Sequence, residues 1–266
     1  KALDQEQAGV VGRCEREILW AVRSLGGSGG SYKRERKVAL NRIVSEIYSP
    51  PRVASAAKLL PSLKIIPGAS MDITVNQENG EPWDFDILEN RQKAREEFEE
   101  QEPVLLIGSA VCTAFSALQA LNEQRRDPEV VKREWVRAMV HLRFVCELYQ
   151  MQLDNGWYFL HEHPGGATSW KQGCVQDIWS HPDVERIINH QCQFGQRHEG
   201  EPVMKPTGWM SNSPHILAQL NRRCGGTRGI CSATGTPHRH ATGKVARDAA
   251  VYPFLLCKAI LVGLRK

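Results

Sequence analysis

The chain has 266 residues, of which 41% are hydrophobic and 24% are charged, and its formal net charge is +4. This length allows one large or two small domains with a sizeable core, and the composition is typical of a globular protein. No apolar run approaches the roughly 20 residues of a membrane span, and the polar start is not typical of a signal peptide. We therefore expect an intracellular protein with no membrane partner, nuclear if its source is eukaryotic. The mildly basic charge permits a nucleic-acid partner but does not require one.

The first 40 residues are predicted to form a helical amino-terminal extension. Apolar residues recur at helical spacing over residues 4–25. The glycine- and serine-rich residues 26–31 end this helix in a flexible loop, which could equally be an engineered linker.

Strand-like and helix-like segments alternate between residues 41 and 195. The predicted strands cover residues 43–48, 65–72 and 184–189, together with the apolar runs that end before Cys112 and at Glu162. The predicted helices cover residues 53–60, 87–102, 128–155 and 174–179. This order predicts an α/β core, with a mainly parallel sheet and helices on both faces.

The composition changes after residue 195. Residues 196–245 are rich in glycine, proline, serine, histidine and cysteine, and we expect a short Cys/His-rich lobe that serves target recognition or zinc binding. Residues 246–266 are predicted to form an apolar carboxyl-terminal helix that completes the core.

Two predicted strands deliver reactive side chains. The first apolar run reads as a buried parallel strand and ends in a small-residue turn that carries Cys112, and the second places Glu162 at a strand end. Active-site residues of open α/β sheets lie just past the carboxyl ends of strands, so these two are a candidate nucleophile and acid. We also expect the amino end of a following helix to lower the pKa of Cys112. Without such a context, a cysteine at this position is more often a packing residue.

A second group of candidate residues lies in the predicted lobe. Cys224, Cys231, His238 and His240 are ligands that suit tetrahedral zinc, although their spacing matches no standard zinc finger. The alternative is a solvated loop in which these residues are incidental. Basic residues surround the group and suit phosphate contact, or form a solvated face: Arg222, Arg223, Arg228, Arg239, Lys244 and Arg247.

Several ordered motifs resemble those of the DNA cytosine-5 methyltransferases. Residues 106–116 look like the strand and loop with the catalytic cysteine, and residues 161–164 (His-Glu-His-Pro) are similar to the Glu-Asn-Val or Glu-Asn-Pro motif. Residues 191–195 and 205–212 resemble later segments of phage-like members, and Tyr252-Pro253 resembles the motif that closes on the cofactor. The resemblance covers roughly residues 40–264 and extends to a divergent eukaryotic group linked to mobile elements.

The resemblance implies a Rossmann-like, S-adenosylmethionine-dependent methyltransferase fold and methylation of cytosine carbon 5 in DNA. Cys112 would add to carbon 6, Glu162 would hydrogen-bond the adjacent ring nitrogen, and Gln193 would join the catalytic residues. The target base would be flipped out of a duplex or already single-stranded. The implied cofactor-binding residues are Glu46, Ile47, Tyr48, Asp72, Ile73, Asp84, Phe85, Ser109 and Tyr252.

Three departures from the family pattern keep a second hypothesis open. Val111 replaces the proline before Cys112, and His163 replaces the motif asparagine. The first strand ends in Ser49-Pro50-Pro51-Arg52 and not in a glycine-rich turn. The alternative is a catalytically degenerate protein of the same fold that binds nucleic acid or assists a mobile element.

Overall fold

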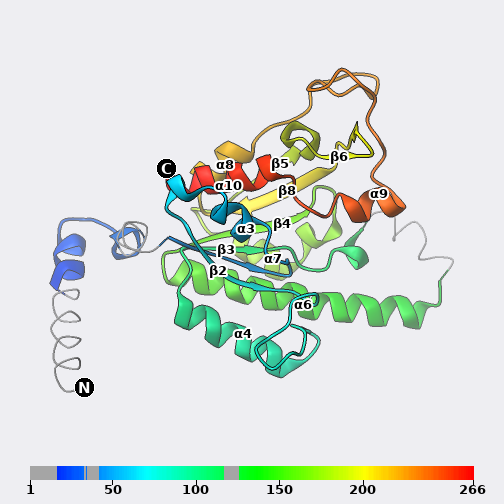
Figure 1. Cartoon of the computed structure of the whole chain (residues 1–266). Coiled ribbons are helices and arrows are strands. Elements are labelled where there is room, and N and C mark those ends of the chain that lie inside the picture. The colour runs from blue at the N-terminus through cyan, green and yellow to red at the C-terminus, as the bar shows by residue number, and fades with distance from the viewer. Residues whose placement is uncertain (1–16, 33, 35–41, 117–125) are drawn as a thin grey trace.

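The computed structural model describes residues 17–32, 34, 42–116 and 126–266 (Figure 1). Part of the predicted amino-terminal helix, residues 4–16, therefore lies outside the described residues. Residues 17–24 are helical as predicted, but residues 29–32 are helical too, where the sequence predicts a flexible loop. The reason is local: the hydroxyl of Ser28 accepts a hydrogen bond from the backbone N–H of Ser31 (3.3 Å), as serines at helix starts do.

A six-stranded sheet forms the centre of the protein, in the strand order β2-β1-β3-β4-β8-β5. The first four run parallel: β2 (Ile66–Met71), β1 (Ile43–Ile47), β3 (Leu105–Gly108) and β4 (Tyr158–Pro164). β8 (Pro206–Ser211) lies antiparallel between β4 and β5 (Glu185–His190). The predicted α/β class with a mainly parallel sheet is confirmed.

Helices cover both faces of this sheet, because successive strand side chains point to opposite sides. Leu106 of β3 packs in one core, and its neighbours Leu105 and Ile107 pack in the other. The first core lies under α4 (Leu88–Gln101), α6 (Pro128–Asp154) and α7 (Gly173–Trp179). The second lies under α3 (Val53–Lys58), α8 (Pro214–Leu220) and α10 (Phe254–Arg265), on the opposite side of the sheet in Figure 1.

Helix α6 begins where the sequence predicts, because the Asp127 side chain accepts a hydrogen bond from the backbone N–H of Glu129 (2.9 Å) and Pro128 occupies the first turn. Its predicted apolar face is buried only from Ala138 onward. Trp135 is 43% exposed, although it fits the helical repeat of apolar residues. The first turns extend beyond the sheet (Figure 1) and so have no core to pack against.

The predicted Cys/His-rich lobe is smaller than the sequence indicates, because residues 206–220 form β8 and α8 of the core. β8 contains Gly208, a residue type that is uncommon within strands. A β-carbon at this position would lie 2.6 Å from the ring of Trp170, so the close packing of β8 against this ring requires glycine. Residues 221–242 carry no helix and no strand beyond isolated bridges. α9 (Gly243–Asp248) then leads into α10.

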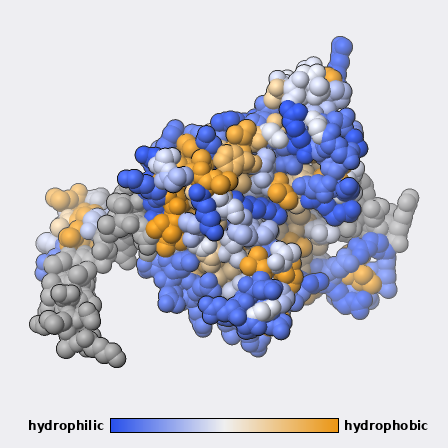
Figure 2. All heavy atoms as spheres, in the orientation of Figure 1, coloured by the Kyte–Doolittle hydropathy of each residue, from blue (hydrophilic) through white to orange (hydrophobic). Residues whose placement is uncertain are grey.

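The remaining elements are short: η1 (Pro61–Leu63), η2 (Thr113–Phe115), η4 (Thr168–Lys171), η5 (Gln191–Phe194), β6 (Arg197–His198) and β7 (Glu201–Pro202). Within the described ranges, none of the helices combines the length and the apolar character that a membrane crossing needs. The face in Figure 2 is mainly hydrophilic, with apolar atoms gathered over α10, where Phe254 and Leu255 are about half exposed.

Candidate active site

The two candidate reactive residues lie at one edge of the sheet. β3 pairs with β4 so that Gly108 is opposite His161, and both strands end at the same edge. Cys112 follows β3, and Glu162 lies near the end of β4. The two are close enough for the charge of Glu162 to act on the thiol of Cys112. The topology therefore brings together the nucleophile and the acid that the sequence predicts.

Cys112 is partly exposed and immediately precedes η2. Burial raises the pKa of its thiol, the charge of Glu162 raises it further, and the charge of Lys205 lowers it. The expectation of a lowered pKa is therefore wrong. The element directly after Cys112 is a three-residue 3-10 turn, which is too short to provide the dipole of a helix amino end. The surroundings of Cys112 therefore favour the thiol over the thiolate.

Glu162 is 8% exposed, and its Oε1 atom has no hydrogen-bond partner among the described residues. Buried polar atoms normally have such partners, so this oxygen is suited to a ligand that offers an N–H group. The Nζ atom of Lys205 lies 4.0 Å from Oε1 and donates to the carbonyl of Ala249 (3.0 Å). Lys205 was not selected from the sequence, although it begins a segment that resembles a family motif.

His163 ties β4 to the loop that carries Cys112. Its Nε2 atom lies 2.9 Å from the carbonyl oxygen of Ala110, so Nε2 must carry the proton and donate. Its Nδ1 atom then accepts from the hydroxyl of Ser169 (2.5 Å). Burial lowers the pKa of His163, which keeps the ring neutral as this arrangement requires. At the position of the motif asparagine, histidine thus makes a direct contact with the cysteine loop.

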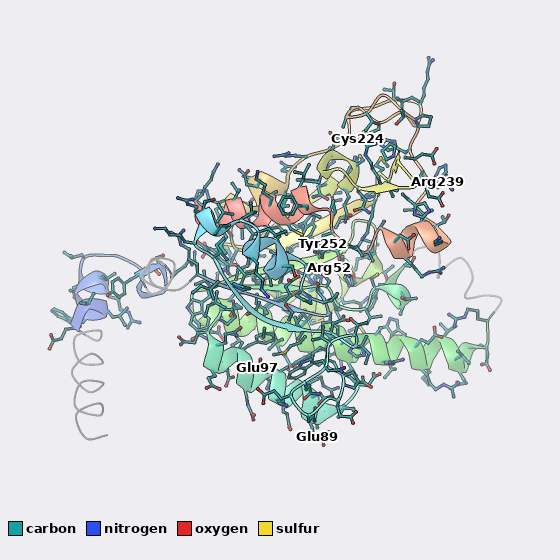
Figure 3. All side chains as sticks on the ribbon, in the orientation of Figure 1. Arg52, Glu89, Glu97, Cys224, Arg239 and Tyr252 are labelled. Atoms are coloured by element: carbon teal, nitrogen blue, oxygen red, sulfur yellow. The ribbon has the colours of Figure 1, made fainter. Side chains whose placement is uncertain are left out.

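Ser109 and Tyr252, both predicted to bind the cofactor, bind each other. Their hydroxyl oxygens are 2.6 Å apart, which joins the loop after β3 to the segment before α10. Arg52 lies over the ring of Tyr252, 5.2 Å from its centroid, and donates to the carbonyl of Ala250 (2.7 Å) (Figure 3). The segment before α10 therefore lies beside the loop that follows β3, and the roles of Ser109 and Tyr252 toward a cofactor stay predictions.

Glu46 is fully buried, and its oxygens are bound to the turn that comes after β1. Oε1 accepts from the backbone N–H groups of Arg52 and Ala54, both at 2.9 Å, and Oε2 accepts from the hydroxyl of Ser49 (3.1 Å). Burial raises the pKa of this carboxyl, and the three hydrogen bonds partly oppose the rise. Glu46 therefore holds the glycine-free turn and the start of α3, and its oxygens do not face an open site.

Asp72 and Ile73, also predicted cofactor residues, come just after the end of β2. Asp72 is partly exposed, and its Oδ1 atom accepts from the N–H (3.0 Å) and the hydroxyl (2.6 Å) of Thr74. Ile73 is 56% exposed. Asp84 is partly exposed and accepts from the N–H of Asp86 (2.9 Å).

The other three predicted cofactor residues pack inward. Ile47 is fully buried, and Phe85 is buried with its ring 4.9 Å from that of Tyr48. The Tyr48 hydroxyl is 3.0 Å from Nδ1 of His141, whose Nε2 is 3.1 Å from Oδ1 of Asp86. Burial lowers the pKa of His141.

Two cavities flank the cysteine loop. The smaller, about 320 Å³, lies between this loop and α6 and is lined by Thr113 and His141, among others. The larger, about 530 Å³, is lined by Ala114 and Ser116 of the loop and by Lys132 and Trp135 of α6. The cysteine loop therefore separates two hollows that can receive a ligand.

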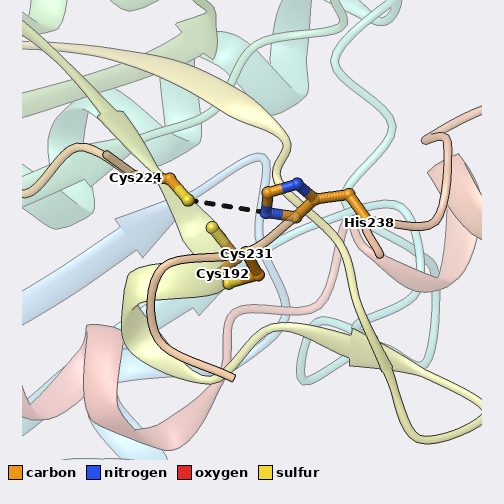
Figure 4. A group of neighbouring side chains, drawn as sticks. All are labelled: Cys192, Cys224, Cys231 and His238. Carbon is orange, nitrogen blue, oxygen red and sulfur yellow. Dashed lines mark hydrogen bonds between the residues drawn. The ribbon is translucent and has the colours of Figure 1, made fainter. Parts of the chain in front are cut away.

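A Cys/His cluster, compatible with a bound metal ion, lies beyond the end of β5 (Figure 4). The ligand atoms of Cys192, Cys224, Cys231 and His238 all lie within 4.8 Å of one another. The structure thus joins three of the four predicted ligands and adds Cys192 from η5. His240 is exposed and is not part of the cluster.

Gln193, predicted to be catalytic, contacts this cluster. Its Nε2 atom is 3.5 Å from the sulfur of Cys192, 3.9 Å from that of Cys231 and 3.3 Å from the hydroxyl of Ser232. Burial raises the pKa of Cys192 to about 12. Desolvation opposes ionisation of Cys224 too, but hydrogen bonds from Ser232 and from the backbone outweigh it and lower its pKa to about 6.

No family model matches the chain, and no curated protein matches it. A solved structure of a methyltransferase from Entamoeba histolytica is similar to part of it, with 13% sequence identity and a TM-score of 0.39. The similarity covers 64% of this chain and 52% of the other, so the chain matches about half the length of that protein.

Proposed function

We propose that the protein is an S-adenosylmethionine-dependent methyltransferase that acts on carbon 5 of cytosine in DNA. The observation that carries the proposal is the pairing of Cys112 with Glu162 across the ends of two neighbouring parallel strands, with Lys205 4.0 Å from the carboxylate. A thiol, a carboxyl and an ammonium group at one edge suit nucleophilic addition of the thiol to a pyrimidine ring.

In this proposal each side chain has a separate task. Sγ of Cys112 adds to carbon 6 of the ring after its thiol proton is lost, and the ammonium of Lys205 favours the thiolate. Glu162 hydrogen-bonds the ring nitrogen through the oxygen that has no partner among the described residues, and so favours the addition. His163 holds the cysteine loop against β4. The addition makes carbon 5 nucleophilic, so carbon 5 would take the methyl group that the bound cofactor supplies. Loss of the carbon 5 proton to water and elimination of the Cys112 thiolate then restore the ring.

The cofactor supplies an electrophilic methyl group when bound. The donor set at the end of β2 fits its adenosine part, since Asp72 offers a partly exposed carboxylate for hydroxyl groups and Ile73 an exposed apolar side chain for a purine face. Glu46 does not fit this task, because both of its oxygens are bound to the turn after β1. We therefore propose Asp72, Ile73 and Asp84 as the cofactor-binding residues.

A nucleic-acid substrate suits the surface around this edge. Arg222, Arg223 and Arg228 are exposed in the segment beyond β5, where they can contact phosphates. Trp135 is 43% exposed in the larger cavity beside the cysteine loop, where its ring can stack on an unpaired base. The exposed tryptophan and the arginines support DNA with a flipped or single-stranded cytosine as the partner.

The catalytically degenerate nucleic-acid-binding protein is the second candidate, and two observations favour it. The thiol of Cys112 has a raised pKa, and the turn after β1 contains two prolines and no glycine. Cofactor binding separates the two candidates, because a ligand of the native state raises the unfolding temperature by mass action. An active enzyme is stabilised by S-adenosylhomocysteine, and a degenerate protein is not.

The experiment that tests the proposal is transfer of a labelled methyl group from S-adenosylmethionine to mixed-sequence DNA. Wild-type protein is expected to label the DNA, and Cys112→Ala is expected to abolish the label while S-adenosylhomocysteine still stabilises the variant. Label that persists in Cys112→Ala would disprove the assigned nucleophile.

A further inference from the structure

The structure assigns a tetrahedral metal site of the zinc type to Cys192, Cys224, Cys231 and His238. This site is separate from the proposed methyl transfer and has no chemical step in it. Its ligands come from two regions of the chain: Cys192 from η5 in the core, and the other three from residues 221–242. The metal therefore cross-links residues 221–242, which are called the lobe from here on, to the core through Cys192.

The four side chains have the chemistry that a structural zinc site requires, and their ligand atoms lie within 4.8 Å of one another. Three thiolates and one imidazole form a common structural zinc set, with bonds of about 2.3 Å to sulfur and 2.0–2.1 Å to nitrogen. In a regular tetrahedron these bonds place a sulfur and a nitrogen ligand about 3.6 Å apart. The sulfur of Cys224 and Nε2 of His238 are 3.6 Å apart (Figure 4). No large movement is needed to enclose an ion.

Hydrogen-bond donors surround the sulfurs, as they do in thiolate metal sites. The N–H of Ser232 lies 3.3 Å from the sulfur of Cys224, and its hydroxyl lies 3.4 Å from the same atom. The side-chain amide of Gln193 approaches the sulfurs of Cys192 and Cys231. A β-carbon at Gly226 would lie 1.8 Å from the carbonyl oxygen of Ile230, so the tight turn between the two lobe cysteines needs glycine there.

The lobe has no apolar core that could hold it in place. Cys231 is the one buried residue from Asn221 to Thr242, and its buried atom is a sulfur of the cluster. Burial of a single side chain contributes little stability to a segment of this size, so a metal cross-link would stabilise it beyond its few hydrogen bonds and ion pairs with the core. The four cluster residues form no disulfide, and their grouping offers a metal ion a place from which it joins the segment to the core.

Metal content is the test, and it needs no activity. The full chain, produced with zinc and freed of loose metal by gel filtration, is expected to retain one equivalent of zinc. Cys192→Ser is expected to retain less than about 0.2 equivalents, since a lost thiolate weakens the site strongly. The matched controls are His240→Ala, a lobe histidine outside the cluster, and Cys174→Ser, a core cysteine outside it. Both controls are expected to retain one equivalent.

Two further measurements keep the test decisive if Cys192→Ser folds poorly. Cobalt added to the metal-free wild type is expected to give the visible ligand-field bands and the thiolate charge-transfer band of tetrahedral cobalt. A chelator is expected to make trypsin cut severalfold faster at the arginines of residues 221–242, which are Arg222, Arg223, Arg228 and Arg239, with no change in cutting outside this segment. Wild-type protein without bound zinc would overturn the assignment, as would loss of zinc from His240→Ala with retention in Cys192→Ser.

Discussion

The imidazole of His163 donates from Nε2 to the carbonyl oxygen of Ala110, 2.9 Å away, two residues before Cys112. The contact joins β4 to the loop after β3, so the strand that carries Glu162 also fixes the position of the cysteine. The contact therefore holds the backbone beside Val111 and Cys112 against β4.

Loss of the hydrogen bond between His163 and Ala110 is expected to lower the stability of the protein and to increase the mobility of the cysteine loop. His163→Ala removes a buried ring and two hydrogen bonds, so the free energy of unfolding should fall by about 2–4 kcal/mol in urea titration. His163→Gln keeps a side-chain N–H near the position of Nε2 and should lose less than half as much. Equal losses in the two variants would show that the hydrogen bond to Ala110 is unimportant.

Acidification is expected to destabilise the fold through the same region. Burial lowers the pKa of both His161 and His163, so the folded state holds these rings neutral while the unfolded state protonates them. The free energy of unfolding should therefore decrease as the pH falls below the unfolded value of about 6.5. This decrease in the free energy of unfolding should be smaller in His163→Gln than in the wild type. In the control variant His215→Gln, which alters an exposed histidine, the decrease should equal that of the wild type. A wild-type profile that is flat from about pH 7.5 to 5.5 would contradict this account.

The reactivity of Cys112 reports the charges around it. The ammonium of Lys205 lowers the pKa of this thiol and the carboxylate of Glu162 raises it. Lys205→Met should therefore slow alkylation of Cys112 by iodoacetamide severalfold at neutral pH, and Glu162→Gln should accelerate it. Mass spectrometry of the Cys112 peptide gives the rate, and Cys112→Ala gives the background. Changes of the same sign in both variants would argue against opposing charges at one site.

Variants of Glu46 distinguish a structural role in the turn after β1 from a role in cofactor binding. Glu46→Ala leaves the N–H groups of Arg52 and Ala54 without their acceptor, so unfolding should become easier by about 2–4 kcal/mol. Glu46→Gln retains an oxygen at this position and should cost less. Stabilisation by S-adenosylhomocysteine should survive in Glu46→Gln and be lost in Asp72→Ala. The reverse result would return Glu46 to the cofactor site.

Much of this architecture could be predicted from the sequence, because the signals are local. The apolar runs before Cys112 and Glu162 identify β3 and β4, and a helix pattern with an Asp-Pro start identifies α6. Parallel strands end at one edge, so the proximity of Cys112 and Glu162 also follows from their positions.

The remainder depends on contacts between distant residues. Cys192 lies 32 positions before Cys224, and only the placement of η5 beside the lobe brings its sulfur to the cluster. β8 has the composition of a loop, because Gly208 makes room for Trp170. Lys205 carries no local sign that its ammonium approaches Glu162. None of these three contacts can be predicted from the spacing of residues along the chain.

The central claim is that Cys112 forms a covalent bond with carbon 6 of a cytosine during methyl transfer. The most direct measurement uses DNA that contains 5-fluorocytosine. A base can remove the proton from carbon 5 of cytosine but cannot remove a fluorine in the same way, so the covalent adduct between Cys112 and the ring is trapped. With S-adenosylmethionine present, the account predicts a complex that survives denaturing electrophoresis and whose cross-linked peptide contains Cys112, and it predicts none for Cys112→Ala. A folded, cofactor-binding wild type that forms no such complex, or a complex through another residue, would contradict it.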